Sequence, residues 1–439
     1  MKTRKVIRLL VTACLTLGIG LAPNRLVRGD SPMEFTVNTT VDGRDFATNG
    51  VCSVGQPVGG PCTLRAAISE GNGNISTTDV TINVPAGNYV LSIPPDAENN
   101  IHTGDLNILP SEAFSYTMTI RGTDPTPAVV DANQIDRVFN IIAATVRLNN
   151  LVIRGGYLEV DEPGVNGGGI YNAGHLTLDH VTIEENTLDC GDEPTCPFGA
   201  YGGGIYHTGD YLELVDTTIQ HNSSPHASAI YHANSGVPLY IKYSTISENH
   251  ADVGSTIINF GELKIINSTI ADNTSGGSTC IENYGDMTIA SSTLSNAGYA
   301  ANIDQRYGTV TIGDSILNAI PNQAGTQYNC YTDNPPEGWT SLGHNIISDD
   351  TCPLDGTGDL LNTNPMLWAL TDSGGPTRTI PLLPASPALD HRNGLCKTLD
   401  GTNLLDDQRH IARDDGFCDT GPYEGYLGMQ KTFLPFIRR

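Results

Sequence analysis

The chain has 439 residues, of which 38% are hydrophobic and only 6% aromatic, and its formal net charge is −25. With 48 acidic residues against 23 Lys and Arg, it lacks the basic surface that sequence-independent nucleic-acid binding requires. Charged residues, at 16%, are too few for an acidic disordered chain. Abundant Gly, Thr, Asn and Ile instead indicate a strand-rich protein that is long enough to bury a large core.

The first 29 residues predict a secretory signal peptide. Lys2, Arg4, Lys5 and Arg8 form a basic start, and the run 9–22 is mostly apolar. This run is short for a membrane span, which needs about 20 residues, and no later segment is apolar enough to cross a bilayer. We therefore expect an exported bacterial protein, secreted or attached to the cell surface, with no transmembrane segment in the mature chain.

Nine cysteines follow the signal peptide, and eight of them form close pairs in loops rich in Gly, Pro and Asp. This spacing predicts four local disulfides, Cys52–Cys62, Cys190–Cys196, Cys330–Cys352 and Cys396–Cys418. Clustered pairs with the spacing of zinc ligands do not occur in the sequence. Cys280 is left over, and its position in the repeat described next predicts a small buried residue with a free thiol.

An eight-residue template recurs seven times, with the pattern apolar, x, Leu/Ile, x, x, small or apolar, x, Ile/Leu. Examples are LTLDHVTI at 176–183 and LKIINSTI at 263–270. The template ends, 23 to 36 residues apart, at Ile153, Ile183, Ile219, Ile246, Ile270, Leu294 and Leu317. Each template reads as two short strands joined by a two-residue bend, and a segment resembling GGGIYNAG (167–174) supplies a third strand upstream.

A unit of about 24 residues cannot bury its apolar face alone, but stacked copies can, with like residues about 4.8 Å apart. The repeat therefore predicts an all-β fold: a single-stranded, right-handed parallel β-helix of the pectate-lyase-like type. A β-propeller blade is longer, and a jelly roll has no self-similar period of this length.

Asn lies three residues after the template's end in four coils, at Asn186, Asn222, Asn249 and Asn273, and the first coil has Gly156 there. Asn and Gly tolerate the left-handed conformation of a sharp corner, and stacked Asn amides can hydrogen-bond from coil to coil. We expect these residues to form the corners.

An N-terminal helix is predicted at 62–72, CTLRAAISEGN. Thr63 can cap it, Leu64 and Ile68 fall on one face, and Gly71 should end it. Such a helix, lying over the first coil, would protect the open end of the solenoid.

Two motifs resemble those of a known group of proteins. CTLRAAI resembles the Cys-Ser-Leu-Arg-Glu-Ala motif that opens many bacterial exported β-helix proteins, with Thr63 and Ala66 as departures. The segments NPMLWALTDSGGPTRTIPLLPASPALD (364–390) and DDQRHIARDDGFCDTGPYEGY (406–426) are similar to the end of choice-of-anchor type Q domain proteins, with departures at His410 and 420–422. The resemblance implies an exported parallel β-helix and carries no agreed catalytic residues.

These observations divide the chain into five segments: a signal peptide at 1–29, an N-terminal cap with the helix at 30–79, β-helix coils at 80–320, a disulfide-containing, loop-rich C-terminal cap at 321–426, and a short basic tail at 427–439.

A column of tyrosines is the first candidate site. If Ile170, Ile205 and Ile230 point inward, the residues that follow them point outward and stack, and these are Tyr171, Tyr206 and Tyr231. Such a strip could bind sugar rings, or it could only stabilise neighbouring coils. The next residues include His207 and His232, which are ligand-binding candidates but lack a third partner for a metal.

A polar patch on the outside of the template strands is the second candidate site. Carbohydrate-cleaving enzymes need converging acids or a basic residue beside them. The weak catalytic candidates are Asp179, Glu213, Asp216 and Lys242. No metal or cofactor is predicted, although the acidic loops 158–163 and 188–194 contain oxygen ligands of the kind that Ca²⁺ binds; a solvated loop is the simpler interpretation.

The sequence therefore favours a non-catalytic role in adhesion or in contact with a polysaccharide or another surface component. A polysaccharide lyase or glycoside hydrolase is the alternative, and a passive surface scaffold is the third. Whether the chain has any enzymatic activity is left open.

Overall fold

The structure is a computed structural model that describes residues 32–425, apart from 46, 55–58, 75–76, 97–100, 110–115, 162, 192–195, 197–198, 277–278, 297–300, 321–327, 333–337 and 399. The predicted signal peptide and basic tail lie outside these residues. No helix in the described part is long and apolar enough to cross a membrane.

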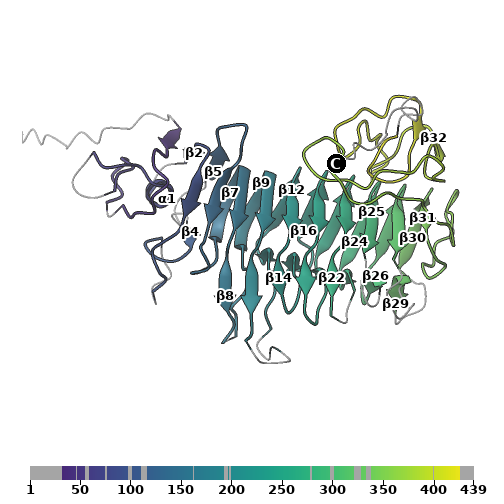
Figure 1. Cartoon of the computed structure of the whole chain (residues 1–439), viewed down its shortest axis with the longest axis horizontal. Coiled ribbons are helices and arrows are strands. Elements are labelled where there is room, and N and C mark those ends of the chain that lie inside the picture. Colours follow the sequence, from purple (N-terminus) through teal and green to yellow (C-terminus); the bar gives the residue numbers. More distant parts are fainter. Residues whose placement is uncertain are drawn as a thin grey trace, which may run out of the picture. The chain divides into compact units, whose positions relative to one another are not determined.

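The fold is the predicted all-β parallel β-helix, in which parallel strands of successive coils form columns (Figure 1). Column A comprises β4 (Leu106–Ile108), the first parts of β7 (Phe139–Arg154) and β9 (Ile170–Glu184), β11 (Ile205–His207), β15 (Ile230–His232), β19 (Ile257–Asn259), β23 (Ile281–Asn283), β26 (Ala301–Gln305) and β29 (Tyr328–Thr332).

Column B comprises β1 (Met33–Thr36), β2 (Val80–Val84), β5 (Thr117–Gly122), the middle of β7 and β9, β12 (Tyr211–Val215), β16 (Pro238–Lys242), β20 (Glu262–Ile266), β24 (Asp286–Ala290), β27 (Val310–Gly313) and β30 (Trp339–Gly343). Column C comprises β3 (Asn88–Val90), β6 (Ala128–Asp131), the ends of β7 and β9, β13 (Thr218–Gln220), β17 (Thr245–Ser247), β21 (Thr269–Ala271), β25 (Thr293–Asn296), β28 (Ile316–Ala319) and β31 (Ile346–Ile347).

The middle coils contain a fourth short column that the repeat did not predict. Column D comprises β8 (Tyr157–Glu159), β10 (Thr187–Asp189), β14 (Ser223–Ser224), β18 (His250–Ala251) and β22 (Thr274–Ser275). The columns also extend beyond the coil segment predicted at 80–320, because β1 pairs with β2 before it and β29 to β31 continue all three main columns after it.

The seven template ends are stacked as predicted. Ile183 pairs with Ile153 and Ile219, and the same register continues through the remaining members to Leu317 and then Ile347. These side chains are fully buried in one continuous core. The apolar spacing of the template is therefore explained by burial of every inward position.

The Asn ladder exists, but the corner residue lies one position earlier than predicted. Left-handed φ values of 54° to 58° occur immediately before each Asn, at Glu185, His221, Glu248 and Asp272. Each Asn instead points inward, and its Nδ2 donates to Oδ1 of the next Asn at 2.9–3.0 Å, from Asn186 to Asn296. Because an amide both donates and accepts, identical side chains can satisfy one another in a buried row.

A second buried row, of serines, was not predicted. It lies just after the template's bend, where the backbone N–H of Ser244 donates to Oγ of Ser268, and that of Ser268 to Oγ of Ser292, both at 3.1 Å. Each hydroxyl also donates to a backbone carbonyl, as Ser268 does to Ile266. The residue before each serine again has positive φ, for example Tyr243 at 52° and Asn267 at 51°.

The N-terminal helix is confirmed. Helix α1 (Leu64–Asn72) begins at the N-cap Thr63, whose hydroxyl accepts from the N–H of Ala66. It ends at Gly73 rather than at Gly71. Gly71 lies inside the helix, where its carbonyl accepts from the Tyr116 hydroxyl. A glycine suits this position because a Cβ there would lie 2.6 Å from Met118.

All four predicted disulfides are present, and Cys280 is free and buried, as expected. Burial raises the pKa of the Cys280 thiol to about 12, so the thiol stays protonated. Cys280 directly precedes the buried Ile281, just as Gly169 directly precedes Ile170, so the two residues occupy equivalent positions in their coils.

The end of the chain closes the solenoid and then folds back along it. Cys352 and Leu354 join the main core at the last coil. Residues 364–425, here called the flank segment, then contact several coils laterally. Arg378 pairs with Glu248, and Arg392 pairs with Asp314 at 2.7 Å. Figure 1 shows this segment in yellow-green, above β25 in that view.

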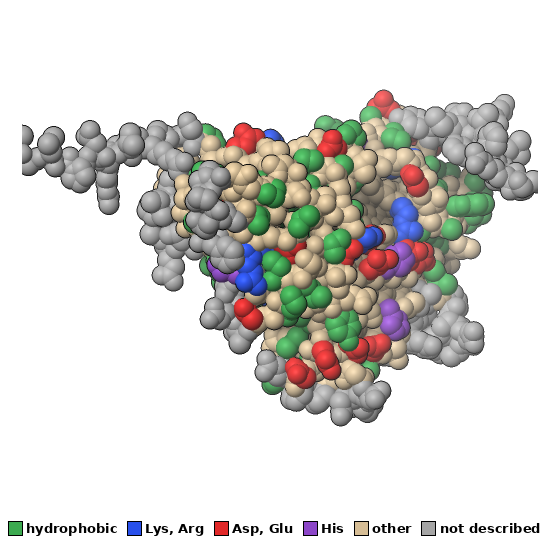
Figure 2. All heavy atoms as spheres, turned by 60° about the vertical axis from the view of Figure 1, so that its left-hand side comes forward, with side chains coloured by type: hydrophobic (Ala, Val, Ile, Leu, Met, Phe, Trp, Pro, Cys, Tyr) green, Lys and Arg blue, Asp and Glu red, His purple; other side chains and the backbone are tan. Residues whose placement is uncertain are grey.

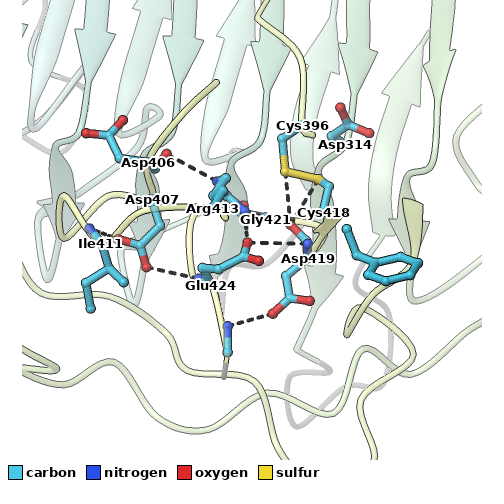
Figure 3. Close-up of polar contacts among 12 residues, drawn as sticks. Asp314, Cys396, Asp406, Asp407, Ile411, Arg413, Cys418, Asp419, Gly421 and Glu424 are labelled. Carbon is cyan, nitrogen blue, oxygen red and sulfur yellow. Dashed lines mark hydrogen bonds and ion pairs between the residues drawn. A yellow bond between two sulfur atoms is a disulfide. The ribbon is translucent and has the colours of Figure 1, made fainter. Parts of the chain in front are cut away.

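A buried ion pair holds the flank segment together. Arg413 and Glu424 have side chains that are 0% and 2% exposed. Arg413 also donates to the carbonyl of Gly421, and the disulfide Cys396–Cys418 lies nearby (Figure 3). The antiparallel pair β32 (Arg392–Asn393) and β33 (Phe417–Cys418) is the segment's small sheet.

We predict that Asn249→Ala lowers the free energy of unfolding by on the order of 3 kcal/mol, because it leaves several buried partners of one amide without hydrogen bonds. Val253→Ala, at a side chain that is 44% exposed, should change it by under about 0.5 kcal/mol. Urea unfolding measures both, and equal effects would contradict the ladder's role.

Candidate functional site

The tyrosine column lies on the outside of column A, as predicted. Ile170, Ile205 and Ile230 are fully buried, and the tyrosines that follow them are partly exposed. The ring centroids of Tyr171 and Tyr206 are 5.4 Å apart, and those of Tyr206 and Tyr231 are 5.1 Å apart with nearly parallel planes.

The column is longer than the three tyrosines predicted from the sequence. The column continues through the rings of Phe260, Tyr284 and Tyr307. From Tyr231 onward, the successive ring centroids are 5.8, 4.6 and 6.0 Å apart. These rings come from the turn between columns A and B rather than from the strand. An aromatic-Gly dipeptide repeats at 260–261, 284–285 and 307–308, and this signal could have revealed the extension.

Stacking decides which parts of the rings a ligand can reach. Most inner rings stack on a neighbour, so they present mainly their edges and the hydroxyls of the tyrosines; the planes of Tyr231 and Phe260 are tilted by 51°. The guanidinium of Arg137 lies 5.6 Å from the centroid of Tyr171 at one end. At the other end Tyr307 is 68% exposed. Burial raises the pKa of Tyr231 to about 12, so that its hydroxyl stays protonated and can both donate and accept.

His207 and His232 are not surface residues, which corrects the prediction that they are ligand-binding candidates. Both side chains are fully buried inside column A, where their rings stack at 5.2 Å. Asn172 contacts Nδ1 of His207 and Asn259 contacts Nδ1 of His232, both at 2.8 Å. Strand alternation explains the error, because a residue after an outward Tyr must point inward.

Burial lowers the pKa of His207 to about 3 and that of His232 to about 4. Within the described part of the chain, Nε2 of neither ring has a hydrogen-bond partner. Both imidazoles are therefore neutral in the folded protein at ordinary pH.

We predict that the protein loses stability as pH falls below about 6.5. The unfolded histidines gain protons there, whereas the folded ones do not until about pH 3 to 4, so each contributes a loss on the order of 2 kcal/mol between pH 7 and pH 5. Unfolding free energies measured across this range test the prediction.

The double variant His207→Asn/His232→Asn is the matched test, because Asn172, Asn259 and Asn283 occupy the same position in neighbouring coils. Its stability should depend less steeply on pH between 7 and 5. An unchanged slope would show that these two histidines do not cause the acid sensitivity.

Two of the four catalytic candidates neutralise each other. Nζ of Lys242 lies 2.7 Å from Glu213, and the same ammonium lies 4.7 Å from the centroid of Tyr240. Nζ of Lys264 also lies over this ring, 5.2 Å from its centroid. Neither Glu213 nor Lys242 is left as an unpaired acid or base on this surface.

Asp179 and Asp216 belong to a different group. In the parallel pairing of β9 and β12, Asp179 lies opposite Val215, whereas Glu213 lies opposite Thr177. Asp179 therefore does not face Glu213. Its neighbour His180 contacts Asp179 at 2.6 Å and Asp216 at 3.9 Å. Asp216 is almost fully buried, and burial raises the pKa of its carboxyl group.

The flank segment completes this group. Nε2 of His410 lies 2.8 Å from Asp216, and its Nδ1 lies 3.1 Å from Asp406. The ring also stacks on Tyr243, whose hydroxyl donates to Asp406. We call Asp179, His180, Asp216, Asp406 and His410 the Asp-His cluster. On the face drawn in Figure 2, acidic, basic and histidine side chains gather beside a hollow.

The structure describes part of the two acidic loops. Glu159 and Asp189 lie on the paired strands β8 and β10, and Asp189 accepts from the Tyr157 hydroxyl. Residues 162 and 192–194 of these loops lie outside the described residues.

Comparisons with known proteins show a likeness to a solved structure. No protein-family model matches the chain, and no curated protein matches it. A solved structure, the crystal structure of pectate lyase Pel9A, has 12% sequence identity and a TM-score of 0.44, covering 90% of this chain and 98% of that chain.

Proposed function

We propose that this protein is exported by a bacterium and binds a glycan outside the cell or at the cell surface, without cleaving it. This proposal rests on the aromatic column, which runs without a break from Tyr171 to Tyr307 on the outside of successive coils. The four disulfides are consistent with an oxidising compartment.

The column offers two kinds of contact to a sugar chain. At its open end, the exposed ring of Tyr307 can stack on the apolar face of a sugar. Along its length, ring edges and hydroxyls repeat about every 5 Å, and the Tyr hydroxyls can exchange hydrogen bonds with sugar hydroxyls. This spacing is close to the length of one sugar residue in an extended polysaccharide, so consecutive residues could meet consecutive coils.

Binding without cleavage is the better supported form of this function. Glu213 and Lys242 are paired with each other, and Asp216 contacts His410 of the flank segment. Within the described residues, the aromatic column therefore has no unpaired catalytic acid from this set beside it.

We predict that the purified protein binds at least one member of a panel of polysaccharides, and that Tyr307→Ala weakens this binding about tenfold, since one stacked aromatic ring contributes about 1.4 kcal/mol. Tyr328→Ala is the matched control, because Tyr328 is 44% exposed but lies outside the column. Affinity electrophoresis or calorimetry measures the effect, with thermal unfolding as a check on the fold.

Release of reducing ends or unsaturated products from the same panel would instead establish the polysaccharide lyase or glycoside hydrolase alternative. Absence of binding across the panel would leave the passive scaffold. An equal loss of polysaccharide affinity in Tyr307→Ala and Tyr328→Ala would show that the aromatic column is not the binding surface.

A further inference from the structure

Two acids continue the outer face of column A beyond the tyrosines. Glu282 and Asp304 pair in register on β23 and β26, and each follows an inward, fully buried isoleucine. They therefore occupy the outward positions at which Tyr206 and Tyr231 lie in earlier coils. Like charges in directly adjacent positions repel each other, so this pair needs a compensating charge.

One arginine compensates both acids. Nη2 of Arg306 lies 2.6 Å from Asp304, and Nε of Arg306 lies 3.6 Å from Glu282. Asp304 is buried, whereas the side chains of Glu282 and Arg306 are 15% and 33% exposed, so a ligand can reach these two. We call the three residues the acid-arginine triad. With two carboxylates and one guanidinium, the triad has an excess of one negative charge at neutral pH.

The triad belongs to the surface of the aromatic column. The Tyr284 hydroxyl donates to Glu282 at 2.6 Å, and the ring of Tyr284 lies in the column between those of Phe260 and Tyr307. Burial and the hydrogen bond to Glu282 raise the pKa of Tyr284, so its hydroxyl stays protonated and keeps this bond. A sugar chain that follows the column from the exposed ring of Tyr307 therefore passes the triad.

Other basic side chains beside the column do not offset the triad. At the Tyr171 end, the guanidinium of Arg137 is already paired with Asp105, at 3.2 Å. His226 is close enough to Glu282 to interact with it electrostatically, but burial lowers the pKa of His226, so its imidazole is neutral at pH 7. The excess negative charge therefore remains at the open end of the column.

We infer that the aromatic column selects polysaccharides whose sugars carry no carboxylate or sulfate groups, and that the acid-arginine triad determines this selectivity. The inference rests on the proposed function, because it assigns a ligand class to the same surface. A neutral sugar hydroxyl can donate to Glu282 and accept from Arg306. A carboxylate on the sugar cannot donate, and the excess charge of the triad repels it. Arg306 attracts such an anion only weakly because two carboxylates already share its charge.

The test compares polymers that differ in charge on the same backbone. Polygalacturonate is paired with its fully methyl-esterified form, and a soluble glucan is paired with the same glucan after oxidation of its primary hydroxyls to carboxylates. Calorimetry on the whole purified protein measures both affinities at low salt. We expect the uncharged member of at least one pair to bind at least about tenfold more tightly, and this preference to shrink as salt screens the repulsion.

Glu282→Gln is the first variant, and Glu34→Gln is its matched control. Each removes one carboxylate beside an arginine, but Glu34 lies on β1 at the start of column B, 3.7 Å from Arg121. Glu282→Gln should narrow the preference for uncharged polymers about fivefold, because it removes the excess negative charge of the triad. Glu34→Gln should leave the preference unchanged. Arg306→Gln should widen it, and thermal unfolding of each variant checks the fold.

The outcomes separate this inference from the proposed function. Equal or tighter binding of the charged polymers would overturn the selectivity and leave glycan binding in place. An equal change of preference in Glu282→Gln and Glu34→Gln would also overturn the inference, since it would assign the preference to the net negative charge of the whole chain. Absence of binding to every polymer would overturn the proposed function, and the inference with it.

Discussion

Parallel stacking in register is the constraint on which the rest of this structure depends. Each residue lies between its own equivalents in the coils before and after it, so a side chain must be compatible with copies of itself. Inward aliphatic side chains satisfy this condition by burial. Asn and Ser satisfy it because each can donate to one neighbour and accept from the other, as Asn249 does between Asn222 and Asn273. A buried row of one charge could not form in this way.

The same constraint shapes the outer surface. Aromatic residues in equivalent positions stack on one another, and charged residues pair from coil to coil, as Glu213 does with Lys242. These contacts involve only neighbouring coils. The Asp-His cluster differs because His410 comes from the flank segment, so its composition does not follow the repeat. Chemistry that needs unlike groups around one point can therefore arise where a non-repeating segment lies against the solenoid.

The repeat made most of the fold predictable from the sequence. Ile183, Ile219 and the other template ends identified the register, and local spacing identified the four disulfides. The conformation of single residues was less predictable: Glu185 and its equivalents adopt the left-handed conformation although Asn186 follows them. Intrinsic preference favours Asn at such corners, but the buried amide ladder requires it one position later.

The candidate sites were predictable only where the repeat extends to them. The Tyr column followed from strand alternation, which also shows that His207 must point inward. The contact between His410 and Asp216 joins residues 194 positions apart, and neither periodicity nor local spacing carries information about such a pair. The resemblance of 406–426 to a known C-terminal region likewise gave no indication of which coils it would contact.

The disulfides have a mechanical consequence. They enclose sequence separations of 10, 6, 22 and 22 residues, so each one closes a loop within the N-terminal cap, within a coil or within the flank segment. Among the described residues, coils far apart along the solenoid share no covalent link other than the chain itself. Under tension along the strand columns, coils would separate in succession. Each disulfide would prevent the loop that it closes from being extended. The flank segment bridges several coils from the side, so force transmitted through it would be distributed over all of them before any single coil opened.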